Sequence, residues 1–181
     1  IAQGKKVGIL DLSQGELGSR GSGEIRLVES ANAAKILGVA VRENLGFADG
    51  FFTNDKAHQL EIIKVIRKYQ PTIILSNAPS DRHPDHGRAS KLISDACFYS
   101  GLIRIETQME DVCQDKWRPQ AIYNYIQDRY IDPDFVVDVS AYVDTKIESI
   151  KAYTSQFHNP DSTEPETPIS GEKFFDFIKE R

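Results

Sequence analysis

Short apolar runs that alternate with longer helical patterns constrain the fold of this chain more than any other feature. Residues 7–12 are nearly all apolar, and residues 72–77 are of the same type, which is typical of parallel strands covered on both faces. Each run is followed by a polar loop and then by apolar residues at helical spacing, at 24–37 and 88–100. This alternation predicts an α/β fold, a Rossmann-like, mostly parallel sheet with helices on both faces.

The remaining elements follow from the same patterns. We expect further strands at 39–45, 121–126 and 135–140, and further helices at 55–69, 141–157 and 171–181. Asp55 can cap the helix that Pro71 ends, whereas 106–118 are polar and irregular and 158–170 form a proline-rich surface loop. No linker divides the chain, so the sequence predicts a single domain over residues 1–181.

The composition fits one globular domain and disfavours two classes of partner. The 181 residues carry 22 Lys and Arg against 27 Asp and Glu, a formal net charge of −5. Nucleic acids and anionic membranes select basic surfaces, so neither is expected as a partner. The sequence has no apolar run of membrane-spanning length and no signal peptide, and Cys97 and Cys113 fit no metal or redox spacing. We therefore expect a cytoplasmic protein in which Cys97 is a buried thiol.

The loop after the first strand, SQGELGSRGSG at residues 13–23, is rich in glycine but lacks a phosphate-binding signature. It matches neither G-x-G-x-x-G nor G-x-x-x-x-G-K-S/T. A flexible loop that needs positive φ angles is one interpretation. Arg20 favours another, because its guanidinium can bind a substrate carboxylate or sugar oxygens through parallel hydrogen bonds.

The loop after residues 72–77 carries the strongest chemical signal. It places Asp81, Arg82, His83, Asp85 and His86 within six residues. Neutral imidazole is a common metal ligand, and a carboxylate beside a histidine fixes its tautomer. The position also suits catalysis, since open α/β sheets bind ligands beyond the carboxyl ends of their strands. A metal or acid–base site is one interpretation, and a polar loop that caps the next helix is the other.

A complete zinc site would need more than this cluster. Catalytic zinc takes about three protein ligands. His58 lies in or before a helix and His158 begins the proline-rich loop, and both are expected to be solvated. The residues alone therefore predict an incomplete metal site.

Five segments together carry a resemblance to a known family: KKVGILDLSQGELGSRG, ENLGFADGFF, NAPSDRHPDHGRASKLISDACF, FVVDVS and IKAYTSQFHNP…EPETPIS. The chain resembles the LmbE-like, PIG-L-type zinc de-N-acetylases, and among them most of all the deacetylases of bacillithiol biosynthesis. The resemblance implies a Rossmann-like, zinc-dependent hydrolase that removes acetyl from the glucosamine amine of N-acetylglucosaminyl-malate. It also implies that an acetylated glucosamine conjugate is the small-molecule partner and that the protein is a homo-oligomer.

The resemblance assigns roles to three residues of the histidine-rich loop. His86 matches the family's third zinc ligand. His83 matches the histidine that polarises or protonates the tetrahedral intermediate, and Asp85 matches the aspartate between them, which supports the site. Because imidazole and carboxylate ligands suit several divalent metals, Fe2+ is an alternative to Zn2+.

The resemblance also indicates where the substrate is held. Arg20 matches an arginine that contacts the substrate. Arg82 and Asp49 are further candidates for such contacts.

One motif of the family does not occur in this sequence. The family's first strand ends in A-H-P-D-D, which supplies the other two zinc ligands and the general base. We expect the 181 residues to be part of a longer enzyme, without that central strand and without the family's C-terminal tail. A non-catalytic α/β sugar-binding or regulatory module that has lost its metal site is the alternative. A nucleotide-binding domain is disfavoured, because the glycines form no dinucleotide fingerprint.

Overall fold

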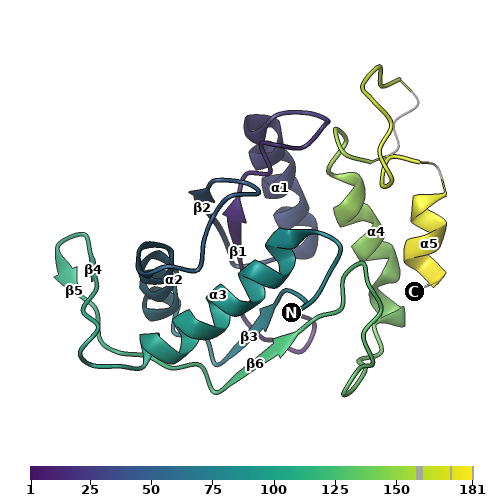
Figure 1. Ribbon diagram of the computed structural model, residues 1–181. Helices are drawn as coiled ribbons and strands as arrows, with labels where there is room; N and C mark the ends of the chain where they lie inside the picture. The colour runs from purple at the N-terminus through teal and green to yellow at the C-terminus, as the bar shows by residue number, and fades with distance from the viewer. Residues whose placement is uncertain (158–160, 172, 181) are drawn as a thin grey trace. The chain divides into compact units, whose positions relative to one another are not determined.

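The chain folds into two compact units in the computed structural model, which describes residues 1–157, 161–171 and 173–180 (Figure 1). Unit 1 comprises Ile1–Asp49 and Val136–Arg181, and unit 2 comprises Gly50–Phe135. Each unit combines a pair of parallel strands with helices, so the predicted α/β class is confirmed. In the described residues, no helix is long and apolar enough to cross a membrane.

Unit 1 is built on two parallel strands and the helix that connects them. Its elements are β1 (Gly8–Ser13), α1 (Gly23–Leu37), β2 (Val41–Phe47), the 3-10 helix η1 (Ser140–Tyr142), α4 (Val143–Lys151) and α5 (Phe174–Glu180). β1 pairs with β2 in parallel, with Asp11 opposite Asn44. Ser22 caps α1 through its side chain, and Gly38 ends the helix in the left-handed region at φ +68°. α1 packs against α4, which brings the two chain segments of the unit together.

Unit 2 has its core between two helices. Its elements are α2 (Lys56–Tyr69), β3 (Ile73–Ser76), α3 (Pro84–Ser100), β4 (Gln108–Met109), β5 (Val112–Cys113) and β6 (Ala121–Asn124). β3 and β6 are parallel, and β4 and β5 form an antiparallel hairpin. α2 packs against α3, and the side chains buried on these helices include Ile62, Ile63, Ile66, Leu92, Ala96 and Cys97. Asp55 caps α2 as predicted, accepting a hydrogen bond from the His58 amide.

A buried arginine of α2 holds the chain that leaves α3. Arg67 is only 4% exposed, and it donates hydrogen bonds to the carbonyls of Ser100, Leu102 and Ile105 and to the Thr107 hydroxyl. A cation is favoured at the carbonyl end of a helix. Burial lowers the pKa of Arg67 from its ordinary value. This side chain therefore ties the end of α3 and the chain that follows it to α2.

Three local predictions are wrong. Residues 135–140 form no strand: the Asp138 carboxylate accepts a hydrogen bond from the Ser140 amide, and Ser140 is the first residue of η1. The helix predicted at 141–157 is α4, which ends at Lys151. Residues 106–118 contain the β4–β5 hairpin, whose turn has Glu110 and Asp111 at φ values of 49° and 62°.

The strand predicted at 72–77 is not covered on both faces within unit 2. Ile73 and Leu75 are 55% and 68% exposed, whereas Ser76 is buried. Successive side chains of a strand point to opposite faces, and α3 contacts β3. In the described residues β3 pairs with β6 alone, and β1 pairs with β2 alone.

Candidate active site

The histidine-rich segment of unit 2 forms the start of α3 and not a free loop. His83 is the N-cap residue with extended backbone angles, φ −81° and ψ 127°, and its Nδ1 accepts a hydrogen bond from the Asp85 amide at 3.2 Å. Pro84 takes the first helical position, where its missing N–H is not needed. The helix therefore begins at Pro84 and not at residue 88 as predicted. We call residues 81–86 the histidine turn.

The cap contact fixes the tautomer of His83. Because Nδ1 accepts a hydrogen bond, the proton of the neutral ring lies on Nε2. His83 is exposed, and its ring centroid lies 5.2 Å from that of His86. The ring therefore offers an Nε2–H donor to a bound molecule.

A buried carboxylate orients His86. His86 Nδ1 makes a short contact with Asp81 Oδ2, and the Asp81 side chain is fully buried whereas that of His86 is 32% exposed. Burial alone would raise the pKa of Asp81, but hydrogen bonds from the Arg129 amide, the His86 ring and further amides hold this pKa well below its ordinary value. An ionised carboxylate only accepts, so Nδ1 carries the proton and Nε2 of a neutral ring has a lone pair for a ligand.

The other two polar residues of the turn have partners of their own. Asp85 is buried, accepts a hydrogen bond from the Gly50 amide at 2.7 Å and pairs with Arg88, whose guanidinium donates to the Gly50 carbonyl at 3.0 Å. Asp85 therefore holds the Gly50 peptide, while Asp81 is the carboxylate that contacts a histidine. Arg82 is exposed and forms an ion pair with Asp128 at 3.2 Å.

Sequence reasoning gave Asp81 no role. Its position five residues before His86, within the same cluster, was the available signal. A carboxylate on Nδ1 of a metal-binding histidine is a common arrangement, so either aspartate of the turn could have been its partner.

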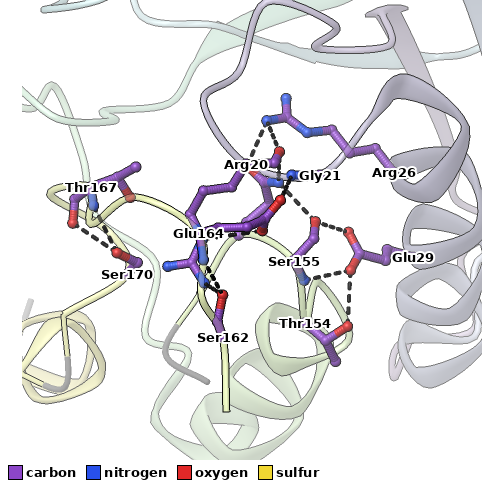
Figure 2. Close-up of polar contacts among 11 residues, drawn as sticks. Arg20, Gly21, Arg26, Glu29, Thr154, Ser155, Ser162, Glu164, Thr167 and Ser170 are labelled. Carbon is purple, nitrogen blue, oxygen red and sulfur yellow. Dashed lines mark hydrogen bonds and ion pairs between the residues drawn. The ribbon is translucent and has the colours of Figure 1, made fainter. Parts of the chain in front are cut away.

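In unit 1, Arg20 is buried and contacts its own chain. The residue is 4% exposed, Nη2 donates to Ser162 Oγ at 2.7 Å, and Nε lies 3.7 Å from Glu164 Oε2 (Figure 2). The Gly21 amide donates to Glu164 Oε1 at 2.8 Å. The predicted substrate-binding guanidinium is therefore held in the structure by the segment that follows residue 160.

Arg26 of α1 shapes the glycine-rich loop. Its guanidinium donates to the carbonyls of Gly15 and Arg20 and to Gln156 Oε1. A Cβ atom at Gly15 or Gly18 would lie 2.0 or 1.7 Å from a guanidinium nitrogen of Arg26, so a larger residue there would displace this side chain. Gly15 also has φ +68°, which favours glycine.

Glu29 of the same helix binds the segment after α4. Glu29 is 5% exposed, and its carboxylate accepts hydrogen bonds from the Thr154 hydroxyl, the Ser155 amide and the Ser155 hydroxyl at 2.7–3.0 Å (Figure 2). Sequence reasoning missed both Arg26 and Glu29. Their three-residue spacing, which puts two charges on one face of α1, was the signal.

Asp49 anchors the loop to the end of β1. Its carboxylate accepts hydrogen bonds from the Ser13 hydroxyl at 3.3 Å and the Leu17 amide at 3.1 Å. Its own amide donates to Glu16 Oε1 at 2.8 Å. The candidate residues thus fall into two sets: Arg20 and Asp49 belong to unit 1, and the histidine turn belongs to unit 2.

A cavity of about 210 Å³ lies beside the loop within unit 1, and its lining includes Asp11, Arg42, Asn44 and Tyr153. Arg42 donates two hydrogen bonds to the Asp11 carboxylate, at 2.6 and 2.9 Å. The charges of these two lining residues are therefore already matched.

The described residues fit one metal ligand and not a complete metal site. Within residues 1–157, 161–171 and 173–180, no three His, Cys, Asp or Glu side chains form a group that could hold a metal ion. His86 has the carboxylate contact typical of a histidine ligand. His58 instead lies beside Asp55, with Nδ1 at 3.0 Å from Oδ1, and His158 is outside the described residues.

Comparison with known proteins identifies the family. The sequence matches the family described as PIG-L: GlcNAc-PI de-N-acetylase over residues 1–97, which include both the glycine-rich loop and the histidine turn. The chain belongs to the PIG-L family. It is similar to a diacetylchitobiose deacetylase of Thermococcus kodakarensis, with 29% identity over 153 residues, 83% of this chain and 56% of that protein. The chain thus spans a little over half the length of this curated relative.

Two solved structures share the fold. The conserved protein TT1542 from Thermus thermophilus has 35% identity and a TM-score of 0.79, covering 86% of this chain and 69% of that one. An N,N'-diacetylchitobiose deacetylase from Pyrococcus horikoshii has a TM-score of 0.80, covering 98% of this chain and 66% of that one. Because its sequence identity is only 23%, the similarity to the Pyrococcus structure supports the fold alone.

Proposed function

We propose that the full-length protein is a metal-dependent hydrolase that removes acetyl from the amine of an N-acetylated glucosamine conjugate. Membership of the PIG-L family and the similarity to a protein named diacetylchitobiose deacetylase support this reaction class. The observation that carries the proposal is the histidine turn, where neighbouring rings expose an Nε2–H donor and an Nε2 acceptor. Hydrolysis of an amide can use both groups, the donor to bind the carbonyl oxygen and the acceptor to hold a metal ion.

His83 is the proposed electrophilic group. As water adds to the acetyl carbonyl, negative charge develops on the carbonyl oxygen, and Nε2–H of His83 donates a hydrogen bond to it. A donor fixed in advance stabilises the transition state more than the ground state, which accelerates the step. Asp85 supports this geometry by holding the Gly50 peptide against the start of α3.

His86 is the proposed metal ligand of this chain, with Zn2+ as the cofactor and Fe2+ as the alternative. Asp81 keeps the Nδ1 proton in place and leaves Nε2 for the metal. The A-H-P-D-D motif that would supply further ligands is not in this sequence, and we propose that it belongs to the longer protein.

The proposed substrate is N-acetylglucosaminyl-malate, with Arg20, Arg82 and Asp49 as contacts for its sugar and anionic ends. Guanidinium groups suit carboxylates because they bind them through two parallel hydrogen bonds. A diacetylated disaccharide is the competing substrate, suggested by the name of the Thermococcus relative. A homo-oligomer, a cytoplasmic location and the lack of nucleic-acid or membrane partners stay predictions.

Amine release from several acetylated glucosamine conjugates tests the proposal, using the full-length protein loaded with Zn2+ or Fe2+. We expect release of acetate and free amine, faster with the malate conjugate than with N,N'-diacetylchitobiose. Binding of these sugars without release under every metal condition would contradict the enzyme and favour a non-catalytic sugar-binding module.

The role of His83 makes a sharper prediction, because this side chain also caps α3. His83→Asn keeps a good N-cap residue but removes the imidazole, whereas His83→Ala removes both. We expect His83→Asn to lower kcat by about 10²–10³ with little change in KM or melting temperature. An unchanged chemical step in single-turnover measurements would contradict this role.

A further inference from the structure

The guanidinium that is proposed to bind substrate already contacts a carboxylate of its own chain. The Glu164 carboxylate contacts two neighbouring residues: Oε1 accepts a hydrogen bond from the Gly21 amide at 2.8 Å, and Oε2 lies 3.7 Å from Arg20 Nε (Figure 2). The Arg20 side chain is 5% exposed and that of Glu164 is 41% exposed. A buried cation is thus matched by an anion that solvent can reach.

The contact with Glu164 leaves one N–H donor of Arg20 without an acceptor. At 3.7 Å the Arg20–Glu164 pair is an ion pair without a hydrogen bond, and Arg20 Nε is a buried atom with no hydrogen-bond partner. Carboxylates bind guanidinium groups best through two short parallel hydrogen bonds. A carboxylate in that geometry would satisfy Nε, which Glu164 does not.

The site does not depend on Glu164 for its position. The Arg20 carbonyl accepts hydrogen bonds from Gln156 Nε2 at 2.7 Å and from Arg26 Nη2 at 3.3 Å. Both donors are held elsewhere in unit 1, since Arg26 also binds Gly15 and Gln156. The backbone of Arg20 and the adjoining Gly21 amide are therefore held by contacts that do not involve the Glu164 side chain. The guanidinium has a second contact in Ser162 Oγ, which accepts from Nη2 at 2.7 Å.

We propose that Glu164 is an internal occupant of a carboxylate site formed by the Arg20 guanidinium, the Gly21 amide and the Ser162 hydroxyl, and that a carboxylate of the substrate replaces it. The inference rests on the proposed function, to which it adds a residue that sets substrate specificity. An anionic conjugate gains the hydrogen bonds of Arg20 but must displace Glu164. A neutral sugar does not form these hydrogen bonds and does not displace Glu164. Glu164 therefore sets how strongly the site prefers an anionic conjugate over a neutral sugar.

Binding of malate and of its neutral diamide, malamide, to the full-length protein tests the exchange by calorimetry. Exposed ion pairs are weak, so we expect Glu164→Gln to tighten malate binding roughly two- to five-fold. Glu166→Gln is the matched control, because Glu166 is exposed in the same segment and the substitution removes the same charge. We expect it to bind malate as the wild type does, and Arg20→Gln to lose malate binding.

A direct readout accompanies the affinities. Malate added to the wild type should shift the amide resonances of Gly21 and Glu164 together, whereas malamide should shift neither. Equal tightening in both glutamate variants, no tightening in Glu164→Gln, or no malate binding would each overturn the exchange. Amine release from a neutral acetylated disaccharide, measured in parallel, separates the two proposals. If amine is released but Glu164→Gln does not tighten malate binding, only the exchange is contradicted. If Glu164→Gln tightens malate binding but no amine is released, only the deacetylase is contradicted.

Discussion

The glycine-rich loop and the histidine turn follow a strand in each unit, yet their charged groups are held in different ways. Arg20 is buried and contacts segments more than 130 residues away in the sequence. His83 and His86 are oriented by Asp85 and Asp81, which are two and five residues away. The contacts of Arg20 come from distant segments of unit 1, whereas each histidine is oriented by a residue of its own turn.

This difference matches the tasks that we propose. A group that stabilises a transition state works best when its orientation is fixed before the substrate arrives. A group that selects among substrates can contact an internal competitor. The competitor then lowers the affinity of every ligand that cannot replace it. The comparison therefore predicts that mutations around Arg20 change stability and specificity, while mutations in the histidine turn change the chemical step.

The largest effect on stability is expected at Glu29. Glu29→Ala leaves the Ser155 amide and two hydroxyl groups without their buried acceptor, which should lower the free energy of unfolding by about 2–4 kcal/mol. Glu24→Ala is the control, because Glu24 is an exposed residue in the first turn of the same helix. Urea denaturation measures both. Equal losses would mean that the Glu29 contacts do not hold unit 1 together.

A smaller but chemically specific effect is expected at Asp81. Asp81→Asn keeps the shape of the side chain but removes the charge that fixes the His86 tautomer, which should lower metal affinity or kcat/KM about 10- to 100-fold. Asp128→Asn is the control, since its carboxylate pairs with the exposed Arg82 and the substitution removes the same charge. The ¹⁵N shifts of the His86 ring report the tautomer independently of activity. Unchanged ring shifts in Asp81→Asn would contradict the orienting role.

Local signals were sufficient where a residue and its neighbours determine the structure. The prediction that Asp55 caps α2 is confirmed. Such caps satisfy backbone groups a few residues away, so the sequence pattern contains their partners. The cluster of polar residues at 81–86 was recognised for the same reason.

Long-range contacts could not be predicted in this way. Residues 135–140 have strand-forming side chains, but a strand also needs a neighbouring strand, and in the described structure Asp138 forms a local turn instead. The contact between Gly21 and Glu164 spans 143 positions, and no spacing rule connects them. The sequence therefore indicated Arg20 as a binding residue but not the carboxylate that contacts it.

The smallest expected effect concerns the anchor between the glycine-rich loop and Asp49. The hydrogen bond from the Asp49 amide lowers the pKa of Glu16 from its ordinary value of 4.5. A lowered pKa in the folded state means that the anchor stabilises the loop above about pH 4.5 and weakens as the pH falls through the folded pKa. We expect the Asp49 amide resonance to move over this acidic range in the wild type and to move less in Glu16→Gln. Glu24→Gln should titrate like the wild type at this amide. An equal movement in Glu16→Gln would assign the titration to another group and would contradict a contribution of the Glu16 carboxylate to the loop anchor.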